Sequence, residues 1–102
     1  MNREALEQML AQGKDNALLR YTLGTICLKE GSLDDAVRHL QKALRQDDKH
    51  TASWKSYAKA LAELGQVDDA RAAYEKGIAV AESNGDIQAA REMKVFLKRL
   101  AG

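Results

Sequence analysis

The side chains that could act as catalysts or metal ligands are few and scattered along the chain. The only histidines are His39 and His50, and the only cysteine is Cys27. The histidines fit no metal-ligand spacing, and a lone cysteine can form no disulfide within the chain. We expect His39 on an exposed helix surface, His50 in a turn and Cys27 in the core. These residues predict no metal, no cofactor and no enzymatic activity.

Paired aspartates occur twice, as Asp34-Asp35 and Asp68-Asp69. A catalytic pair of carboxylates has to share one cleft with its substrate. These two pairs instead stand at equivalent places, where helices are expected to begin. A carboxylate in the first turn of a helix interacts favourably with the positive end of the helix dipole. We therefore assign both pairs to helix stabilisation rather than to catalysis.

The composition favours a helical protein with a modest core. The chain has 102 residues, no proline and a formal net charge of +1, and it is rich in residues that favour helices. A balanced charge argues against a dedicated nucleic-acid-binding or membrane-surface protein. No apolar run is long enough to cross a membrane, and the first residues lack the apolar core of a secretion signal. We therefore expect a cytoplasmic protein.

A self-similarity with a period of 34 residues runs through the middle of the chain. Shifting the sequence by 34 places Gly31 on Gly65, Ala36 on Ala70, and the first aspartate pair on the second. A period of this length is typical of stacked helical repeats. Such repeats form extended surfaces, so the period favours a protein that holds another polypeptide.

Helical periodicity predicts six helices joined by short turns, and no strand. Glycines can end helices because they adopt the left-handed conformation without penalty. Side chains that can cap a helix precede three of the apolar stripes, at Asn16, Ser32 and Thr51. We predict a single domain over residues 1–102. Its parts are an N-terminal helix over 3–13, helical hairpins over 17–50 and 51–84, and a last helix over 86–101.

The two hairpins resemble the tetratricopeptide repeat family, which combines Leu-Gly, aromatic and small residues at fixed positions. The matching residues are Leu23-Gly24, Ala36, Leu40 and Ala43 in the first hairpin, and Trp54, Tyr57-Ala58, Ala70, Tyr74 and Gly77 in the second. Arg20 and Cys27 stand where the family has aromatic residues. The resemblance covers residues 17–84 and implies an all-α, right-handed α-solenoid. It would consist of two tetratricopeptide hairpins between an N-terminal half-repeat helix and a C-terminal capping helix.

The capping helix does not follow the repeat register. An exact shift of 34 residues would bury Gln88, Arg91 and Glu92, at a high desolvation cost. A slip of one or two residues instead buries an apolar stripe formed by Ala89 or Ala90, Met93, Phe96 or Leu97, and Leu100. The sequence leaves the exact register open.

In the resembled family, the first helices of the hairpins line a concave groove that holds an extended peptide or a partner helix. The resemblance therefore implies a protein–protein interaction module that acts as an adaptor, an assembly factor or a chaperone-like protein. The corresponding peptide-binding residues are Tyr21, Thr25, Leu28, Lys55, Lys59, Glu63 and Arg91. Lys55 and Lys59 lie one helical turn apart and point the same way, which suits an acidic peptide or a C-terminal carboxylate. They could equally be ordinary solvated lysines.

Two other functions remain open. The apolar stripe of the last helix, with Val95, could be a homodimer face, so a self-associating structural protein is the alternative to a monomeric binding module. Nucleic-acid binding would need a basic stripe, for which this helix offers Arg91, Lys94, Lys98 and Arg99. A net charge near zero makes this the less favoured function. The sequence identifies neither the partner nor the pathway.

Overall fold

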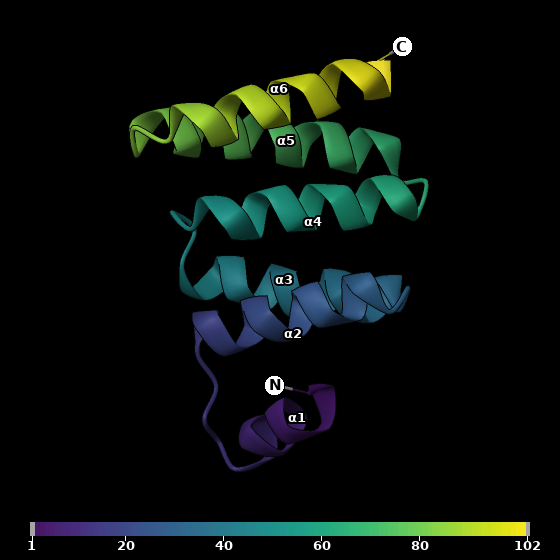
Figure 1. Cartoon of the computed structure of the whole chain (residues 1–102), viewed down its shortest axis with the longest axis vertical. Helices are drawn as coiled ribbons and strands as arrows, with labels where there is room; N and C mark the ends of the chain where they lie inside the picture. Colours follow the sequence, from purple (N-terminus) through teal and green to yellow (C-terminus); the bar gives the residue numbers. More distant parts are fainter. Residues whose placement is uncertain (1, 102) are drawn as a thin grey trace.

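Six α-helices stack in chain order along the longest axis of the molecule (Figure 1). The structure is a computed structural model that describes residues 2–101, in which there is no strand. The helices are α1 (Arg3–Ala11), α2 (Ala17–Lys29), α3 (Leu33–Gln46), α4 (Thr51–Glu63), α5 (Val67–Ser83) and α6 (Ile87–Ala101). In the view of Figure 1, α3 and α5 lie behind α2 and α6, with which they are in contact. The predicted all-α helical repeat fold is confirmed.

The two predicted hairpins have the same turn between their helices. Gly31 and Gly65 adopt positive φ angles of 80° and 82°. The next backbone N–H in each turn donates back to the end of the preceding helix, from Ser32 to Cys27 O at 2.9 Å and from Gln66 to Leu61 O at 3.0 Å. This pattern satisfies helix carbonyls that would otherwise lack a partner. The equal turns follow directly from the repeated glycine.

The predicted helix starts are correct in position for α2 and α3, but only one side chain caps as expected. The Asn16 side chain accepts a hydrogen bond from the backbone N–H of Leu19 at 2.9 Å. Ser32 occupies the N-cap position of α3 without capping it, and its hydroxyl accepts from Arg3 instead. Thr51 is the first residue of α4 rather than its cap, and its hydroxyl accepts from Asn84. Both hydroxyls therefore accept hydrogen bonds from residues distant in the sequence instead of capping a helix.

Small residues let neighbouring helices pack closely. A Cβ on Gly24 would lie 2.5 Å from Cγ of Leu40, and a Cβ on Gly77 would lie 2.7 Å from Sδ of Met93. Both distances are too short for a real side-chain contact, so each glycine makes room for the side chain opposite. Helices α2 and α3 meet at the first contact, and α5 and α6 meet at the second.

The capping helix adopts the slipped register. Ala90 and Met93 are buried, whereas Gln88 and Arg91 are exposed. The other apolar residues of the predicted stripe are half-buried, namely Ala89, Phe96, Leu97 and Leu100. At the other end of the stack, Leu6 of α1 is buried beside Leu19 and Leu23 of α2. Among the described residues, no helix is both long and apolar enough to cross a lipid bilayer.

Candidate functional site

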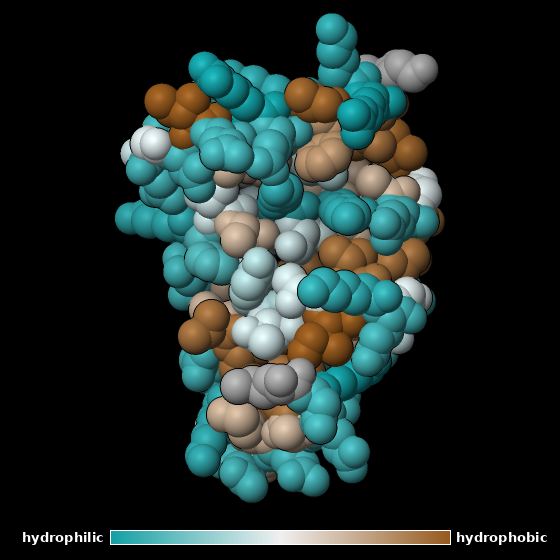
Figure 2. Space-filling view, viewed as in Figure 1, coloured by the Kyte–Doolittle hydropathy of each residue, from teal (hydrophilic) through white to brown (hydrophobic). Residues whose placement is uncertain are grey.

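One face of the molecule is formed by α2, α4 and α6, and we call it the α2–α4–α6 face. Helix α4 contacts both α2 and α6. Figure 2 shows this face, where side chains of intermediate hydropathy gather near the middle and hydrophilic ones lie along the margins. The seven predicted groove residues belong to these three helices.

The predicted residues of α2 are held in place by packing. Tyr21, Thr25 and Leu28 are all half-buried. The Tyr21 ring meets the His50 ring edge-on, with 4.9 Å between centroids and an interplanar angle of 81°. The Thr25 hydroxyl donates to the Thr22 carbonyl at 2.9 Å. Tyr21 therefore offers a pre-positioned aromatic surface, which costs little conformational entropy when a ligand binds.

The two lysines that the sequence paired have different surroundings. Lys59 is exposed, as are Glu63 of α4 and Arg91 of α6. Lys55 is half-buried, and its ammonium group donates to the carboxylate of Glu92 on α6. This bond lowers the pKa of Glu92. Among the described residues, neither Lys59 nor Arg91 is in an ion pair, so both can meet a charged ligand.

The Lys55–Glu92 ion pair lies in a cleft of about 260 Å³ between α4 and α6. Asp86 also lines this cleft, and its side chain accepts a hydrogen bond from the backbone N–H of Ala89 at 3.2 Å. Two carboxylates therefore face one lysine. This cleft disfavours a further carboxylate from a ligand, so an acidic ligand is better accommodated outside it.

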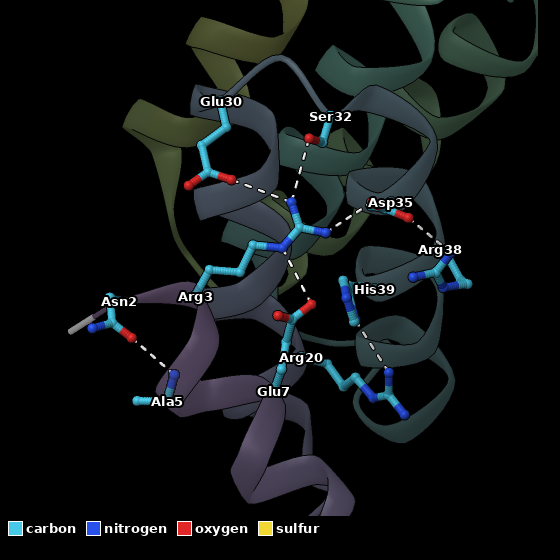
Figure 3. A network of polar contacts seen from close by, with 10 residues as sticks. All are labelled: Asn2, Arg3, Ala5, Glu7, Arg20, Glu30, Ser32, Asp35, Arg38 and His39. Carbon is cyan, nitrogen blue, oxygen red and sulfur yellow. Dashed lines mark hydrogen bonds and ion pairs between the residues drawn. The ribbon is translucent and has the colours of Figure 1, made fainter.

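A buried polar network that the sequence did not predict joins α2 to α3. Arg20 donates to Asp15 at 2.7 and 2.9 Å. Its Nη1 lies 3.1 Å from Nδ1 of His39, a contact drawn in Figure 3. Arg20 and His39 are only 9% and 4% exposed. The expectation of an exposed His39 is therefore wrong. The signal that could have revealed it is Arg20 itself, because an arginine at a core position needs a partner.

The protonation states of this network follow from its geometry. A guanidinium can only donate, so Nδ1 of His39 accepts and the neutral ring carries its proton on Nε2. Burial lowers the pKa of His39, and the charge of Arg20 lowers it further. The hydrogen bonds from Arg20 lower the pKa of Asp15 to about 2. The network therefore joins the charged guanidinium of Arg20 to the neutral imidazole of His39 and to the ionised carboxylate of Asp15.

A second network fastens α1 to the turn between α2 and α3. Arg3 donates to Glu7 and Glu30 at 3.2 Å each, to Ser32 at 3.3 Å and to Asp35 at 2.8 Å (Figure 3). The bond from Arg3 also lowers the pKa of Asp35. These contacts hold the N-terminal helix in place, and no residue of this network belongs to the α2–α4–α6 face.

The remaining candidates for chemistry have structural surroundings. Cys27 is buried as expected, and burial raises the pKa of its thiol. His50 is the N-cap residue of α4, and its Nδ1 lies 2.6 Å from the Ser53 hydroxyl. Within residues 2–101, no three His, Cys, Asp or Glu side chains gather so that they could hold a metal ion.

Comparison with known proteins identifies relatives over almost the whole chain. The sequence profile described as "Tetratricopeptide repeat" matches residues 3–56 and 28–93. A "TPR repeat-containing protein" of Pseudomonas aeruginosa is 48% identical over 97 residues, which cover 95% of this chain and 92% of that protein.

Solved structures show the same arrangement of helices. The solution structure of a protein from Bordetella parapertussis superposes with a TM-score of 0.87 at 46% identity, covering 99% of this chain and 88% of that one. A tetratricopeptide repeat domain protein from Salinibacter ruber has a TM-score of 0.77 at 22% identity, covering 84% of this chain and 87% of that one. At that identity the second match supports the fold alone.

Proposed function

This chain belongs to the tetratricopeptide repeat family, and we propose that it binds a segment of another protein along its α2–α4–α6 face. Tetratricopeptide repeats generally mediate protein–protein interactions, and proteins of the family are typically non-enzymatic scaffolds. The proposed role is that of a cytoplasmic adaptor, assembly factor or chaperone-like protein. The ligand is an extended peptide or a partner helix.

The observation that carries this proposal is the placement of Tyr21. Its ring is fixed against His50, and it is only half-buried. Tyrosine in such a position gives a ligand a large contact area and a hydroxyl group at low entropic cost. Thr25 and Leu28 extend the same helix as a polar and an apolar contact.

The exposed charges favour an acidic ligand that binds outside the cleft between α4 and α6. Lys59 and Arg91 are exposed and attract a carboxylate, whether it belongs to a side chain or to a C-terminus. The charge of Lys55 is already compensated by Glu92. The binding set is therefore Tyr21 with Lys59 and Arg91, while Lys55 contributes less than the sequence predicted.

The test compares two double variants with equal changes in charge. Lys59→Glu with Arg91→Glu changes the proposed face, whereas Lys14→Glu with Arg38→Glu changes exposed residues outside α2, α4 and α6. Proteins captured by the immobilised wild-type chain are quantified against both variants, and a protein lost with the first is titrated in purified form. We expect the control to bind like the wild type. Equal binding by both double variants would refute the proposed face.

Self-association is a second candidate, favoured by the exposure of Ile87 and Val95 on α6, which are 63% and 48% exposed. Light scattering over a wide concentration range tests it, with 11.3 kDa expected for a monomer. The basic stripe needed for nucleic-acid binding is partly engaged. Lys94 pairs with Glu82, and Arg99 lies over the Phe96 ring.

A further inference from the structure

A groove lies on the side of the molecule opposite the α2–α4–α6 face. It consists of two hollows of about 500 and 490 Å³, joined by a third of about 250 Å³. The cleft between α4 and α6 is smaller, at about 260 Å³. All three hollows border Lys76 of α5, so they adjoin one another around this residue and are treated as one groove. We call it the α3–α5 groove, and the residues that define it are Val37, Arg45, Trp54, Tyr57, Ala72 and Lys76.

The groove forms where the backbones of α3 and α5 are separated from each other. Helices α3 and α5 each contact α4. Over the full length of both helices, no Cα of α3 lies within 8 Å of a Cα of α5. Trp54 and Tyr57 of α4 lie between them as the floor. On the α5 side, the wall includes Ala72 and Ala79, whose methyl groups are too short to close the gap.

The floor of the groove is a fixed aromatic pair. The Trp54 and Tyr57 rings lie 6.3 Å apart between centroids, at an interplanar angle of 67°. The indole Nε1–H of Trp54 donates to the carbonyl of Asp48 at 2.8 Å, which sets the orientation of the ring. Both rings are half-buried. Tryptophan and tyrosine in such a setting are the residue types that most often dominate binding energy at protein interfaces.

The groove carries an excess of positive charge. Three cations line it, Arg45, Lys49 and Lys76, against the two carboxylates of Asp48 and Asp69. None of these three cations is in an ion pair within residues 2–101, unlike Lys55 on the opposite face. Lys76 lies where the hollows meet, beside the aromatic floor. A ligand carboxylate placed there would meet an uncompensated ammonium group.

We propose that the α3–α5 groove binds an extended acidic segment of a partner protein. A large apolar side chain of the segment covers Trp54 and Tyr57, and a neighbouring carboxylate pairs with Lys76. An α-helix is about 10–12 Å wide with its side chains, whereas an extended chain can place individual side chains into hollows of about 250–500 Å³. This second surface does not depend on the proposed function of the α2–α4–α6 face.

The first test is an NMR titration of the isotope-labelled protein with acetyl-Glu-Phe-Glu-Leu-Glu-amide. The same peptide with lysine in place of glutamate is the control. We expect the acidic peptide to shift the Trp54 indole N–H signal and the amides of α3 and α5, and the basic peptide to shift them much less. Shifts confined to α2, α4 and α6 would overturn this inference while supporting the proposed function. Equal shifts from both peptides, or none from either, would also overturn it.

Two exposed positions test the same groove by mutation. Lys76→Glu reverses the charge where the hollows meet, and we expect it to weaken binding of the acidic peptide by about fivefold. Lys14→Glu makes the same change at an exposed lysine outside both surfaces and should leave the affinity unchanged. Ala72→Trp fills the groove from α5 and should block the peptide without disturbing the core, because Ala72 is exposed. Unchanged affinity in both groove variants would refute the inference.

Discussion

Nη1 of Arg20 lies 3.1 Å from Nδ1 of His39, in a part of the core where both residues are buried. The contact joins a permanent cation to an imidazole that has to stay neutral to accept the bond. The opposite nitrogen, Nε2, is buried without a hydrogen-bond partner. The pair therefore stabilises the first hairpin only while His39 is unprotonated.

This relationship predicts that the protein loses stability in mild acid. The pKa of His39 is lowered in the folded state from its ordinary value of 6.5, so below that pH the unfolded chain binds the proton more readily. The contribution is fully present above pH 6.5 and is lost as the pH falls towards the folded pKa. The free energy of unfolding should fall by at most about 1.4 kcal/mol per pH unit in this window.

Urea denaturation between pH 7.5 and 5 measures this loss, with His39→Gln as the control that should flatten the slope. The other charged groups that act on the His39 ring are Arg3, Arg38 and Asp35. The arginines do not titrate in this window, and the lowered pKa of Asp35 places its titration at lower pH. An equal slope in His39→Gln would contradict the assignment.

The second prediction concerns replacing both partners of this pair. Arg20→Met alone leaves Nδ1 of buried His39 without a donor, and we expect a loss of about 1–3 kcal/mol in the free energy of unfolding. Arg20→Met with His39→Leu removes both polar groups and should recover much of that loss. A double-mutant cycle by urea denaturation measures the coupling. Purely additive losses would show that the contact has no energetic role.

The third prediction concerns the close contact of the first hairpin. Gly24→Ala places a Cβ 2.5 Å from Cγ of Leu40, so the Leu40 side chain or one of the two helices has to shift. We expect a loss of about 1–3 kcal/mol in the free energy of unfolding. Shortening the opposing side chain, by Leu40→Val, should relieve the overlap, so the double variant should lose less than the sum of the single losses. Thermal and urea denaturation decide, and a neutral Gly24→Ala would refute the packing argument.

The fourth prediction concerns the ion pair between α4 and α6. Glu92→Gln removes the carboxylate that compensates Lys55 and leaves a free cation on the α2–α4–α6 face. Affinity for an acidic partner of that face should rise by up to about fivefold, and less at high salt. Gln88→Glu, which instead adds a carboxylate to the same cleft, should lower it. Calorimetric titration measures both, and the same direction in both variants would contradict the electrostatic argument.

The parts of the sequence prediction that are correct depend on local features of the chain. Glycines at equivalent positions, such as Gly31 and Gly65, end helices because the left-handed conformation is a property of the residue itself. Helical periodicity is local in the same way, so it predicts six helices without knowledge of their partners. The slipped register of α6 follows from the desolvation cost of Arg91 and Glu92 at buried positions. These signals together sufficed for the fold and the family.

The candidate site depended on contacts between helices. The sequence placed Tyr21, Lys55 and Lys59 on first helices, but it could not show that Lys55 already has a partner 37 residues away. It also placed His39 at the surface, although a contact with Arg20, which lies 19 residues earlier in the chain, holds His39 in the core. Such pairs depend on how each helix is rotated and shifted against its neighbour. The 34-residue pattern determined by itself that helices stack here, and only the tertiary packing decided which charges remain free to bind.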